Sequence, residues 1–222
     1  MTIKAIIFDF DGTIADTHDA LVRITNRLSE EFGYKPLEQE ELTFLKNLSS
    51  REIIRKSQIS PLKIFFLLRR VRTELGKEIK TLKPVTGIEA SLWQLKKQGY
   101  QLGVVTSNCK ENVTAFLENN NLDSIFSFIY TDVSLFGKHK VLNQIIRQSR
   151  FKNDEIAYVG DETRDIHCAR KSGAVAIAVG WGFNSPSVLA THQPDYLIEH
   201  PKELVEAIKD PELITPEILH KA

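Results

Sequence analysis

The sequence predicts an α/β fold, in which a doubly wound, mainly parallel sheet carries an inserted all-helical cap. Two observations support this fold class. Short runs of apolar and β-branched residues recur along the chain, and such runs are typical of strands buried on both faces of a parallel sheet. From about residue 85 onward, helical patterns separate these runs, so right-handed crossovers would connect neighbouring strands.

The predicted sheet layer alternates strands with helices. The expected strands are residues 3–8, 102–105, 126–130, 156–159, 175–179 and 196–198. The expected helices between and after them are residues 87–97, 110–119, 138–148, 163–171 and 202–209. Glycine or polar residues follow most of the strands, as expected where the chain leaves a sheet.

The segment between the first two strands differs, because it has helical periodicity without a convincing strand. We expect Asp16 or Thr17, Ser49 and Ser60 to cap the helices of this segment, with Pro61 at a first helical position. The expected helices are residues 20–32, 38–48, 50–58 and 61–80. We therefore predict two domains, an α/β core of residues 1–14 and 84–222 and a helical cap of residues 15–83.

Composition excludes several classes of protein. The 222 residues, 42% of them hydrophobic, are enough for a substantial core. The 29 basic and 29 acidic side chains cancel, so no overall field favours nucleic acid. Two isolated cysteines cannot form a disulfide framework or a four-ligand zinc site, and a reducing cytoplasm is the simplest setting. The short apolar start indicates neither a signal peptide nor a membrane span, and the oligomeric state is left open.

Polar side chains follow several of the predicted strands at the point where each strand ends. Ligands of open α/β sheets bind at the carboxyl ends of the strands, so we expect these residues to form one site. They are Asp9 and Asp11 after the first strand, Thr106, Ser107 and Asn108 after the second, Lys138 at the helix after the third, and Asp161, Glu162 and Asp165 after the fourth.

Asp9 and Asp11 are placed to take two different catalytic roles. They are two residues apart, so in extended backbone their side chains project to the same side and that of Phe10 to the other. One carboxylate can then act as a nucleophile and the other as a general acid and base, because covalent catalysis by aspartate splits phosphoryl transfer into two easier steps.

A carboxylate that attacks a phosphate dianion needs positive charge nearby, because the two repel each other. Asp9, Asp161 and a backbone carbonyl offer the hard oxygen ligands that Mg²⁺ prefers. Lys138 can bridge phosphate and nucleophile. The donors expected to grip the phosphoryl oxygens are the Thr106 hydroxyl and the amides of Ser107 and Asn108.

As a set and in this order, these residues resemble the motifs of the haloacid dehalogenase (HAD) superfamily of phosphatases. The first motif is Asp9 to Thr13, the second Thr106, the third Lys138 and the acidic fourth Gly160 to Asp165. The resemblance implies a Rossmann-like core with a small helical cap. It also implies an aspartyl phosphate on Asp9, with Asp11 first protonating the leaving oxygen and then activating water.

The same resemblance implies a metal site and a substrate class. Mg²⁺ would be held by Asp9, the main-chain carbonyl of Asp11, and Asp161, with Glu162 and Asp165 in support. The run from Asp11 to Asp16 and the run from Gly180 to Phe183 look most like the phosphoglycolate phosphatase group. The substrate expected from this likeness is a small phosphorylated metabolite, with phosphoglycolate as a candidate.

Two alternatives stay open. A sugar phosphomutase of the same superfamily would return the phosphoryl group to a second hydroxyl instead of to water. A non-catalytic regulatory module would bind Mg²⁺ and phosphate without turnover, although such a module has no evident need for the Asp11 carboxylate.

Overall fold

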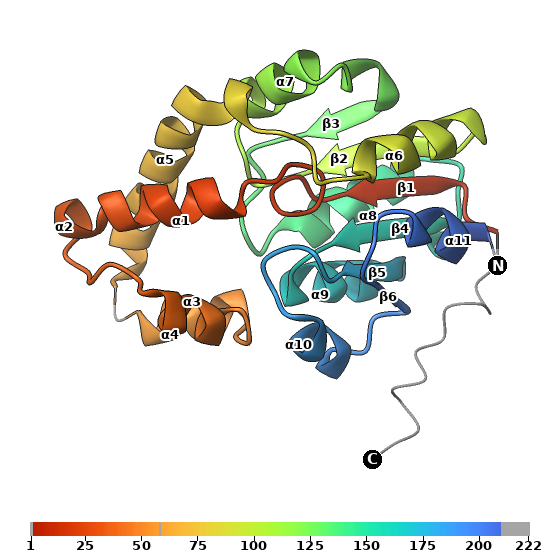
Figure 1. The fold of residues 1–222 in the computed structure, drawn as a ribbon. Coiled ribbons are helices and arrows are strands. Elements are labelled where there is room, and N and C mark those ends of the chain that lie inside the picture. The colour runs from red at the N-terminus through yellow and green to blue at the C-terminus, as the bar shows by residue number, and fades with distance from the viewer. Residues whose placement is uncertain (1, 58, 210–222) are drawn as a thin grey trace.

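The computed structural model describes residues 2–57 and 59–209, in which a parallel sheet with helices on both faces forms the core (Figure 1). The sheet has six strands in the order β3-β2-β1-β4-β5-β6, and every neighbouring pair is parallel. The strands are β1 (Ala5–Phe8), β2 (Gln101–Val105), β3 (Phe128–Tyr130), β4 (Ile156–Gly160), β5 (Val175–Val179) and β6 (Tyr196–Ile198). The predicted doubly wound, Rossmann-like fold is confirmed.

Helices cover the two faces of this sheet in separate apolar layers. One layer packs α6 (Ile88–Lys97), α7 (Lys110–Asn119) and α11 (Glu203–Lys209) on one face. The other packs α8 (Lys138–Gln148), α9 (Thr163–Ser172) and α10 (Pro186–Thr191) on the opposite face. Two short 3₁₀ helices, η2 (Asp123–Ile125) and η3 (Asn153–Glu155), precede β3 and β4.

The outer strand β3 corrects one prediction. We expected residues 126–130 to form a strand buried on both faces, but β3 begins only at Phe128, and Ile129 is 39% exposed. This strand has a neighbour on one side only, so its burial is incomplete and fewer residues pair. The first strand is also shorter than predicted, because it begins at Ala5 instead of Ile3.

Between β1 and α6 the described chain is helical, as predicted, but one helix is broken. The elements are α1 (His18–Arg27), α2 (Ser29–Phe32), α3 (Gln39–Leu45), α4 (Ser50–Lys56), α5 (Pro61–Glu78) and the 3₁₀ helix η1 (Ile79–Thr81). The expected helix of residues 20–32 is interrupted at Leu28, whose amide is shared between the carbonyls of Ile24 and Thr25, as is common where helices end. Residue 58, the predicted end of α4, lies outside the described residues.

The predicted helix caps are confirmed at two places and wrong at a third. The Ser49 hydroxyl accepts from the amide of Glu52, and that of Ser60 accepts from the amide of Lys63. Thr17 stands at the N-cap position of α1, but its buried hydroxyl has no hydrogen-bond partner among the described residues. Its backbone is near-helical, with φ −101° and ψ −6°, whereas a capping side chain needs extended backbone to reach the helix amides.

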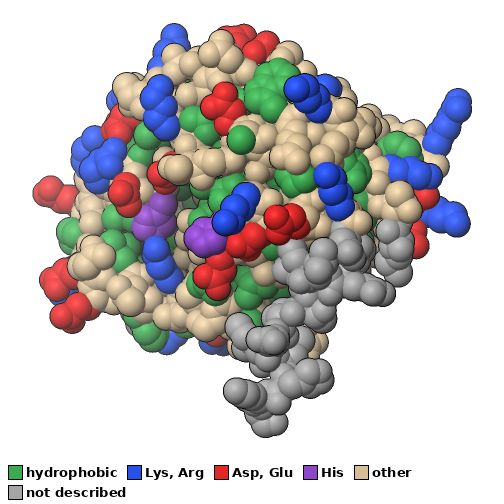
Figure 2. All heavy atoms as spheres, turned by 45° about the vertical axis from the view of Figure 1, so that its right-hand side comes forward, with side chains coloured by type: hydrophobic (Ala, Val, Ile, Leu, Met, Phe, Trp, Pro, Cys, Tyr) green, Lys and Arg blue, Asp and Glu red, His purple; other side chains and the backbone are tan. Residues whose placement is uncertain are grey.

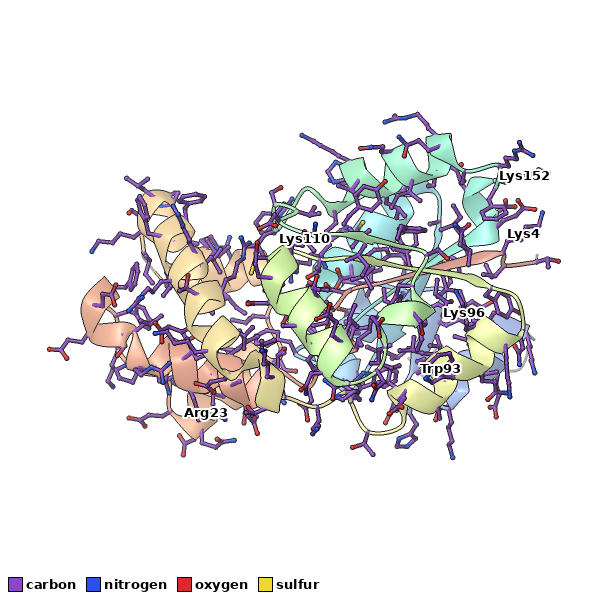
Figure 3. All side chains as sticks on the ribbon, turned by 90° about the horizontal axis from the view of Figure 1, so that it is seen from above. Lys4, Arg23, Trp93, Lys96, Lys110 and Lys152 are labelled. Atoms are coloured by element: carbon purple, nitrogen blue, oxygen red, sulfur yellow. The ribbon has the colours of Figure 1, made fainter. Side chains whose placement is uncertain are left out.

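The helical segment joins the sheet through two chain connections that lie side by side. The amide of Asp16 donates to the carbonyl of Lys83 at 3.0 Å, and the amide of Val85 donates to the carbonyl of Ile14 at 2.9 Å. Apolar residues of α1 and α5 share the core layer of α6 and α7, and Figure 3 shows α5 beside α7. The segment is thus anchored at one edge and extends beyond the end of the sheet (Figure 1).

The molecular surface agrees with the balanced composition. Figure 2 shows acidic and basic side chains interspersed on the face in view. Within residues 2–57 and 59–209, no helix combines the length and the apolar character that a membrane span requires. Cys109 and Cys168 are both free thiols.

Candidate active site

The site begins where two central strands end. The strand order reverses between β1 and β4, and ligands of open α/β sheets bind at such a point, outside the carboxyl ends of the strands. Asp9 follows β1 and Asp161 follows β4, and the amide of Asp9 still pairs with the carbonyl of Val159 at 2.8 Å. Both aspartates are buried, so the sheet fixes their positions.

Three buried carboxylates meet at this point. Oxygens of Asp9, Asp161 and Asp165 lie within 4.8 Å of one another. Lys138 at the start of α8 forms ion pairs with both Asp9 and Asp165, the latter at 2.8 Å, and is buried with them. Burial by itself lowers the pKa of Lys138, but the Asp165 and Asp9 carboxylates outweigh it and raise the pKa above its ordinary value. Lys138 is therefore a permanent cation beside Asp9.

Asp161 is held by donors and by close backbone packing. The Thr13 hydroxyl donates to Oδ1 at 2.8 Å, and the amide of Phe183 donates to Oδ2 at 2.8 Å. A Cβ at Gly12 would lie 2.4 Å from Oδ2 of Asp161, and a Cβ at Gly182 would lie 2.2 Å from its Cβ, so only glycine fits at either position. The turn after β5, which we had not placed in the site, therefore supports its acidic centre.

Asp11 lies apart from this acidic group, in contact with the end of β2. The side-chain amide of Asn108 donates to both carboxylate oxygens of Asp11 at 3.1 Å. Burial, and then the negative charge of Asp9, raise the pKa of Asp11 to about 6. Phe10 points elsewhere, into an edge-on contact with Phe116 of α7 at 5.1 Å between ring centroids. Asp11 therefore keeps its proton to a higher pH than an ordinary aspartate, although the Asn108 donors favour its ionised form.

The loop after β2 gives both amide groups of Asn108 partners within the chain. We expected its main-chain amide to grip phosphate, but this amide donates to the Thr106 hydroxyl oxygen at 3.0 Å. The Asn108 side-chain oxygen accepts from the amides of Cys109 and of the Asn112 side chain, which orients its NH₂ group toward Asp11. Asn108 is committed to positioning Asp11, and Thr106 and Ser107 are the nearby groups left for a phosphoryl oxygen.

Glu162 is turned away from the carboxylate group and toward the helical segment. Its carboxylate pairs with Arg164 and accepts from the Ser50 hydroxyl of α4. Arg164 is a site residue to which the sequence pattern gave no role, and its Nη2 lies 4.0 Å from Oδ2 of Asp9. The available signal was a basic residue placed inside the acidic run from Gly160 to Asp165.

The charge of the site fits a divalent cation. Five carboxylates gather here with the cations of Lys138 and Arg164: those of Asp9, Asp11, Asp161, Glu162 and Asp165. Burial, and then the charges of Glu162, Asp9 and Asp165, raise the pKa of Asp161 well above its usual range. A hard cation bound between the oxygens of Asp9, Asp161 and Asp165 would relieve this repulsion, and oxygen ligands are those that Mg²⁺ takes.

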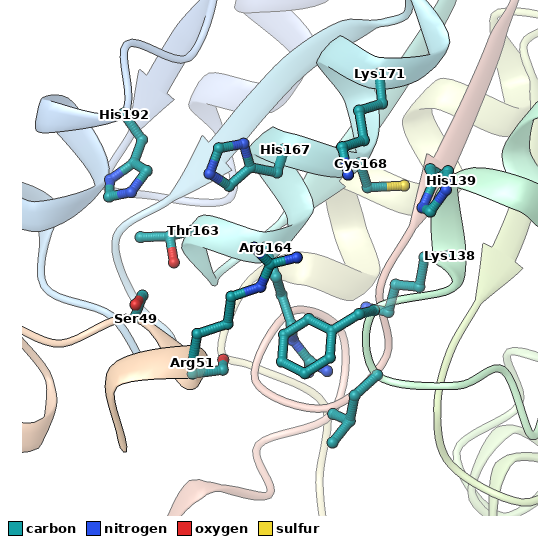
Figure 4. A pocket seen from close by; sticks show the side chains of 13 residues that line it. Ser49, Arg51, Lys138, His139, Thr163, Arg164, His167, Cys168, Lys171 and His192 are labelled. Carbon is teal, nitrogen blue, oxygen red and sulfur yellow. The ribbon is translucent and has the colours of Figure 1, made fainter. Parts of the chain in front are cut away.

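Two hollows border the site. A cavity of about 350 Å³ is lined by the core and by the helical segment, and Asp11, Ser107 and Asn108 are among its polar residues. Its walls are mostly aliphatic, and Arg72 of α5 adds a cation that makes no ion pair with any described residue. A smaller cleft of about 90 Å³ lies on the α9 side, where Arg51 of α4 reaches toward α9 (Figure 4). Arg164 lines both hollows.

The loop between α3 and α4 docks on the core through Asn184. The Asn184 side-chain amide donates to the carbonyls of Lys46 at 3.1 Å and Leu48 at 2.9 Å, and its oxygen accepts from the amide of Thr163 at 3.0 Å. Asn184 is 1% exposed. It joins the helical segment to the first residue of α9, close to the acidic centre.

The fold and the site are those of a haloacid dehalogenase-like hydrolase, and the chain belongs to this family, whose sequence profile matches residues 6–179. The phosphoglycolate phosphatase of Synechococcus elongatus is 37% identical over 206 residues, which cover 93% of this chain and 97% of that protein. The pyrophosphatase PpaX of Bacillus anthracis is 26% identical over 95% of this chain and 98% of its own.

Solved structures show the same fold. A predicted phosphatase from Clostridium acetobutylicum superposes with a TM-score of 0.79 at 23% identity, over 94% of this chain and 99% of that one. The predicted resemblance to the HAD superfamily and to its phosphoglycolate phosphatase group is confirmed. So is the prediction that the chain is an enzyme of the HAD phosphatase type.

Proposed function

We propose that this protein hydrolyses a small-molecule phosphate monoester through an aspartyl phosphate on Asp9. The observation that carries the proposal is the pairing of two differently prepared carboxylates. Asp9 is ion-paired with Lys138 and faces Asp161 and Asp165, whereas Asp11 is hydrogen-bonded to Asn108 and has a raised pKa. The contact with Lys138 suits Asp9 as the nucleophile, and the raised pKa of Asp11 suits Asp11 as the acid.

Asp9 has the contacts that an attacking carboxylate needs. Its Oδ1 accepts from the amide of Phe10 at 2.7 Å, which fixes the orientation of the carboxylate. Lys138 places a positive charge against Oδ2 and so lowers the repulsion between the carboxylate and an incoming phosphate. Attack by Asp9 on phosphorus would break the bond to the leaving oxygen, to which Asp11 gives its proton.

Asp11 would then serve the second step. After giving its proton to the leaving group, Asp11 is a carboxylate that can take a proton from a water molecule. This water molecule attacks the aspartyl phosphate, and the reaction releases inorganic phosphate and restores free Asp9. Asn108 keeps Asp11 in place through both steps, because it donates to both oxygens.

Asp9, Asp161 and the main-chain carbonyl of Asp11 would hold Mg²⁺, with Asp165 and Glu162 in support, and the grouping of Asp165 with Asp9 and Asp161 supports this assignment. When bound, Mg²⁺ supplies charge neutralisation between phosphate and nucleophile. Thr13, Phe183 and the two glycines hold Asp161 in position for this purpose.

The large cavity is the proposed place of the leaving group, because Asp11 is among its polar residues. A cavity of about 350 Å³ suits a small phosphorylated metabolite. Phosphoglycolate is the first candidate, since a relative with 37% identity is a phosphoglycolate phosphatase and Arg72 offers the cavity a cation for a carboxylate. We also infer a cytoplasmic protein that does not bind nucleic acid, from the balanced charge and the sparse cysteines.

Residues 15–83 are proposed to act as a cap that closes over this cavity, with residues 1–14 and 84–222 as the catalytic core. The paired connections of Asp16 with Lys83 and of Val85 with Ile14 form a narrow junction at these boundaries. Closure would exclude water from the leaving-group side while the aspartyl phosphate forms.

The substitution Asp9→Asn tests the mechanism. Asparagine has nearly the same shape but cannot form an aspartyl phosphate, so turnover should fall by at least about 1,000-fold. Phosphate release from a panel of phosphorylated metabolites, with Mg²⁺ and with chelator, is the measurement. Asp19→Asn, at an exposed carboxylate of α1, is the control and should keep full activity. Hydrolysis by Asp9→Asn at the rate of the unmodified protein would reject the mechanism, and dependence on a sugar bisphosphate activator would identify a mutase.

A further inference from the structure

Arg164 carries two donors that the folded chain leaves unused. Its side chain is 12% exposed, and its Nη2 pairs with Glu162. Nε and Nη1 are buried and have no hydrogen-bond partner in the part of the chain that the structure describes. A buried N–H of a charged group without a partner is costly, so these two donors point to a ligand that satisfies them.

The position of Arg164 identifies which part of a ligand these donors meet. Its Nη2 lies 4.0 Å from Oδ2 of Asp9, the proposed nucleophile. A phosphorus atom under attack must come within about 3–3.5 Å of the attacking oxygen, which brings the phosphoryl oxygens within reach of the guanidinium. The leaving group would lie next to Asp11 and Asn108 in the large cavity, which Arg164 also lines.

We propose that Arg164 binds the phosphoryl group that is transferred to Asp9, with free N–H groups on one edge of its guanidinium donating to the non-bridging oxygens. This inference rests on the proposed function and adds a binding residue to it. A planar guanidinium suits the task, because the two N–H groups along one edge of its plane are parallel and match an oxyanion, whereas an ammonium group presents a point charge. Together with Lys138, it places two cations around charge that grows in the transition state.

Glu162 and Ser50 determine how the guanidinium is presented. The Glu162 carboxylate accepts from one N–H of Nη2, which leaves for the phosphoryl group the second N–H of Nη2 beside the unpartnered Nε and Nη1. The same carboxylate accepts from the hydroxyl of Ser50 on α4, so the helical segment takes part in fixing the arginine. Glu162 and Ser50 are positioning residues in this arrangement.

Kinetics with two substrates and three variants test the role of Arg164. The variants are Arg164→Ala, Arg164→Lys and, as control, Arg147→Ala at an exposed arginine of α8. The substrates are 2-phosphoglycolate and p-nitrophenyl phosphate, which share the phosphoryl group but not the leaving group. We expect Arg164→Ala to lower kcat/KM by about 100-fold for both, in line with the loss of one preorganised oxyanion donor.

Three further readouts separate binding of the phosphoryl group from a structural role. The inhibition constant of inorganic phosphate should rise at least about 10-fold in Arg164→Ala, because charged hydrogen bonds to the anion are lost. Arg164→Lys should recover little activity, because the ammonium lacks the fork of donors. Added guanidinium ion should restore part of the activity of Arg164→Ala, and Arg147→Ala should behave as the unmodified protein.

Several outcomes would overturn the inference. Full activity of Arg164→Lys would show that Arg164 acts only as a counter-charge for Glu162. A loss confined to 2-phosphoglycolate would assign Arg164 to the leaving group. If Arg164→Ala fails to fold, as thermal unfolding would reveal, Arg164→Lys and its phosphate inhibition constant decide the question. Absence of phosphate release by the unmodified protein from either substrate would reject the proposed function itself, which is a distinct result.

Discussion

Individual residues around Asp161 show how little free space the acidic centre leaves. The Asp161 carboxylate accepts one hydrogen bond from a hydroxyl and one from a backbone amide. The backbone of Gly12 and Gly182 packs so closely against this side chain that a Cβ at either glycine would clash with it. Side chains packed this closely cannot move away from a new methyl group without losing their hydrogen bonds. The geometry of the metal site therefore depends on residues that have no functional group of their own.

Gly12→Ala should damage the site and not only the fold. Gly12 has φ +75° and a new Cβ would lie 2.4 Å from Oδ2 of Asp161, whereas Gly99 has φ +90° and open space around it. Both alanine variants should lose about 1–2 kcal/mol of stability from left-handed backbone. Only Gly12→Ala should need a higher Mg²⁺ concentration for half-maximal phosphate release, measured by Mg²⁺ titration. Equal Mg²⁺ requirements in the two variants would contradict this account.

At the scale of the elements, hydrogen bonds hold the helical segment against the core beside the site. The helical segment touches the core through the α3–α4 loop, where Asn184 and the amide of Ser185 bond its carbonyls, and through Ser50 of α4, which bonds Glu162. Hydrogen bonds of this kind contribute modestly one by one, which allows a docked element to open and close.

Asn184→Ala should loosen the docking of α3 and α4. The loss of two hydrogen bonds to the carbonyls of Lys46 and Leu48 should weaken docking by about 1–3 kcal/mol. Amide hydrogen exchange should then speed up in α3 and α4 while β1 and β4 keep their protection, and KM should rise. Asn153→Ala, which removes one bond to the carbonyl of Ser172, serves as control. Unchanged exchange in α3 and α4 would show that other contacts hold the segment.

At the scale of the whole molecule, the active site destabilises the folded state as long as the negative charge of its buried carboxylates is not neutralised. Asp9, Asp161 and Asp165 are buried within 4.8 Å of one another, and Lys138 compensates only part of their charge. A ligand that binds only the folded state stabilises it by mass action. Metal binding should therefore be visible in the stability of the entire protein.

Mg²⁺ should raise Tm, and the metal-free Asp161→Asn variant should already be more stable than the metal-free unmodified protein. At about 100 times Kd, the metal stabilises by about 2.7 kcal/mol, or roughly 5–11 °C for a chain of this size. Thermal unfolding with Mg²⁺ and with chelator measures both effects. Asp161→Asn should lose the response to Mg²⁺, and Asp154→Asn, at an exposed carboxylate, should keep it. A response of equal size in Asp161→Asn would remove Asp161 from the metal site.

The local sequence pattern determined the strands, the position of the site residues at the strand ends, and two helix caps. Apolar runs of strand length define the sheet because buried parallel strands need them, and the strand ends place Asp9, Asp11, Thr106 and Asp161 at one edge. The caps at Ser49 and Ser60 follow from hydroxyl chemistry that acts within one helical turn. These features involve residues near one another in the chain, so their pattern is visible without coordinates.

Tertiary structure alone decided what depends on contacts between distant segments. The side chain of Asn108 meets Asp11 across 97 positions of the chain, and Asn184 meets the carbonyl of Lys46 across 138. Arg164 and Glu162 are close in the sequence, but only the folded structure shows that Nε and Nη1 of Arg164 have no partner among the described residues. Hydrogen bonds form between whichever groups packing brings together, and that outcome is a property of the assembled fold, which a local pattern does not contain.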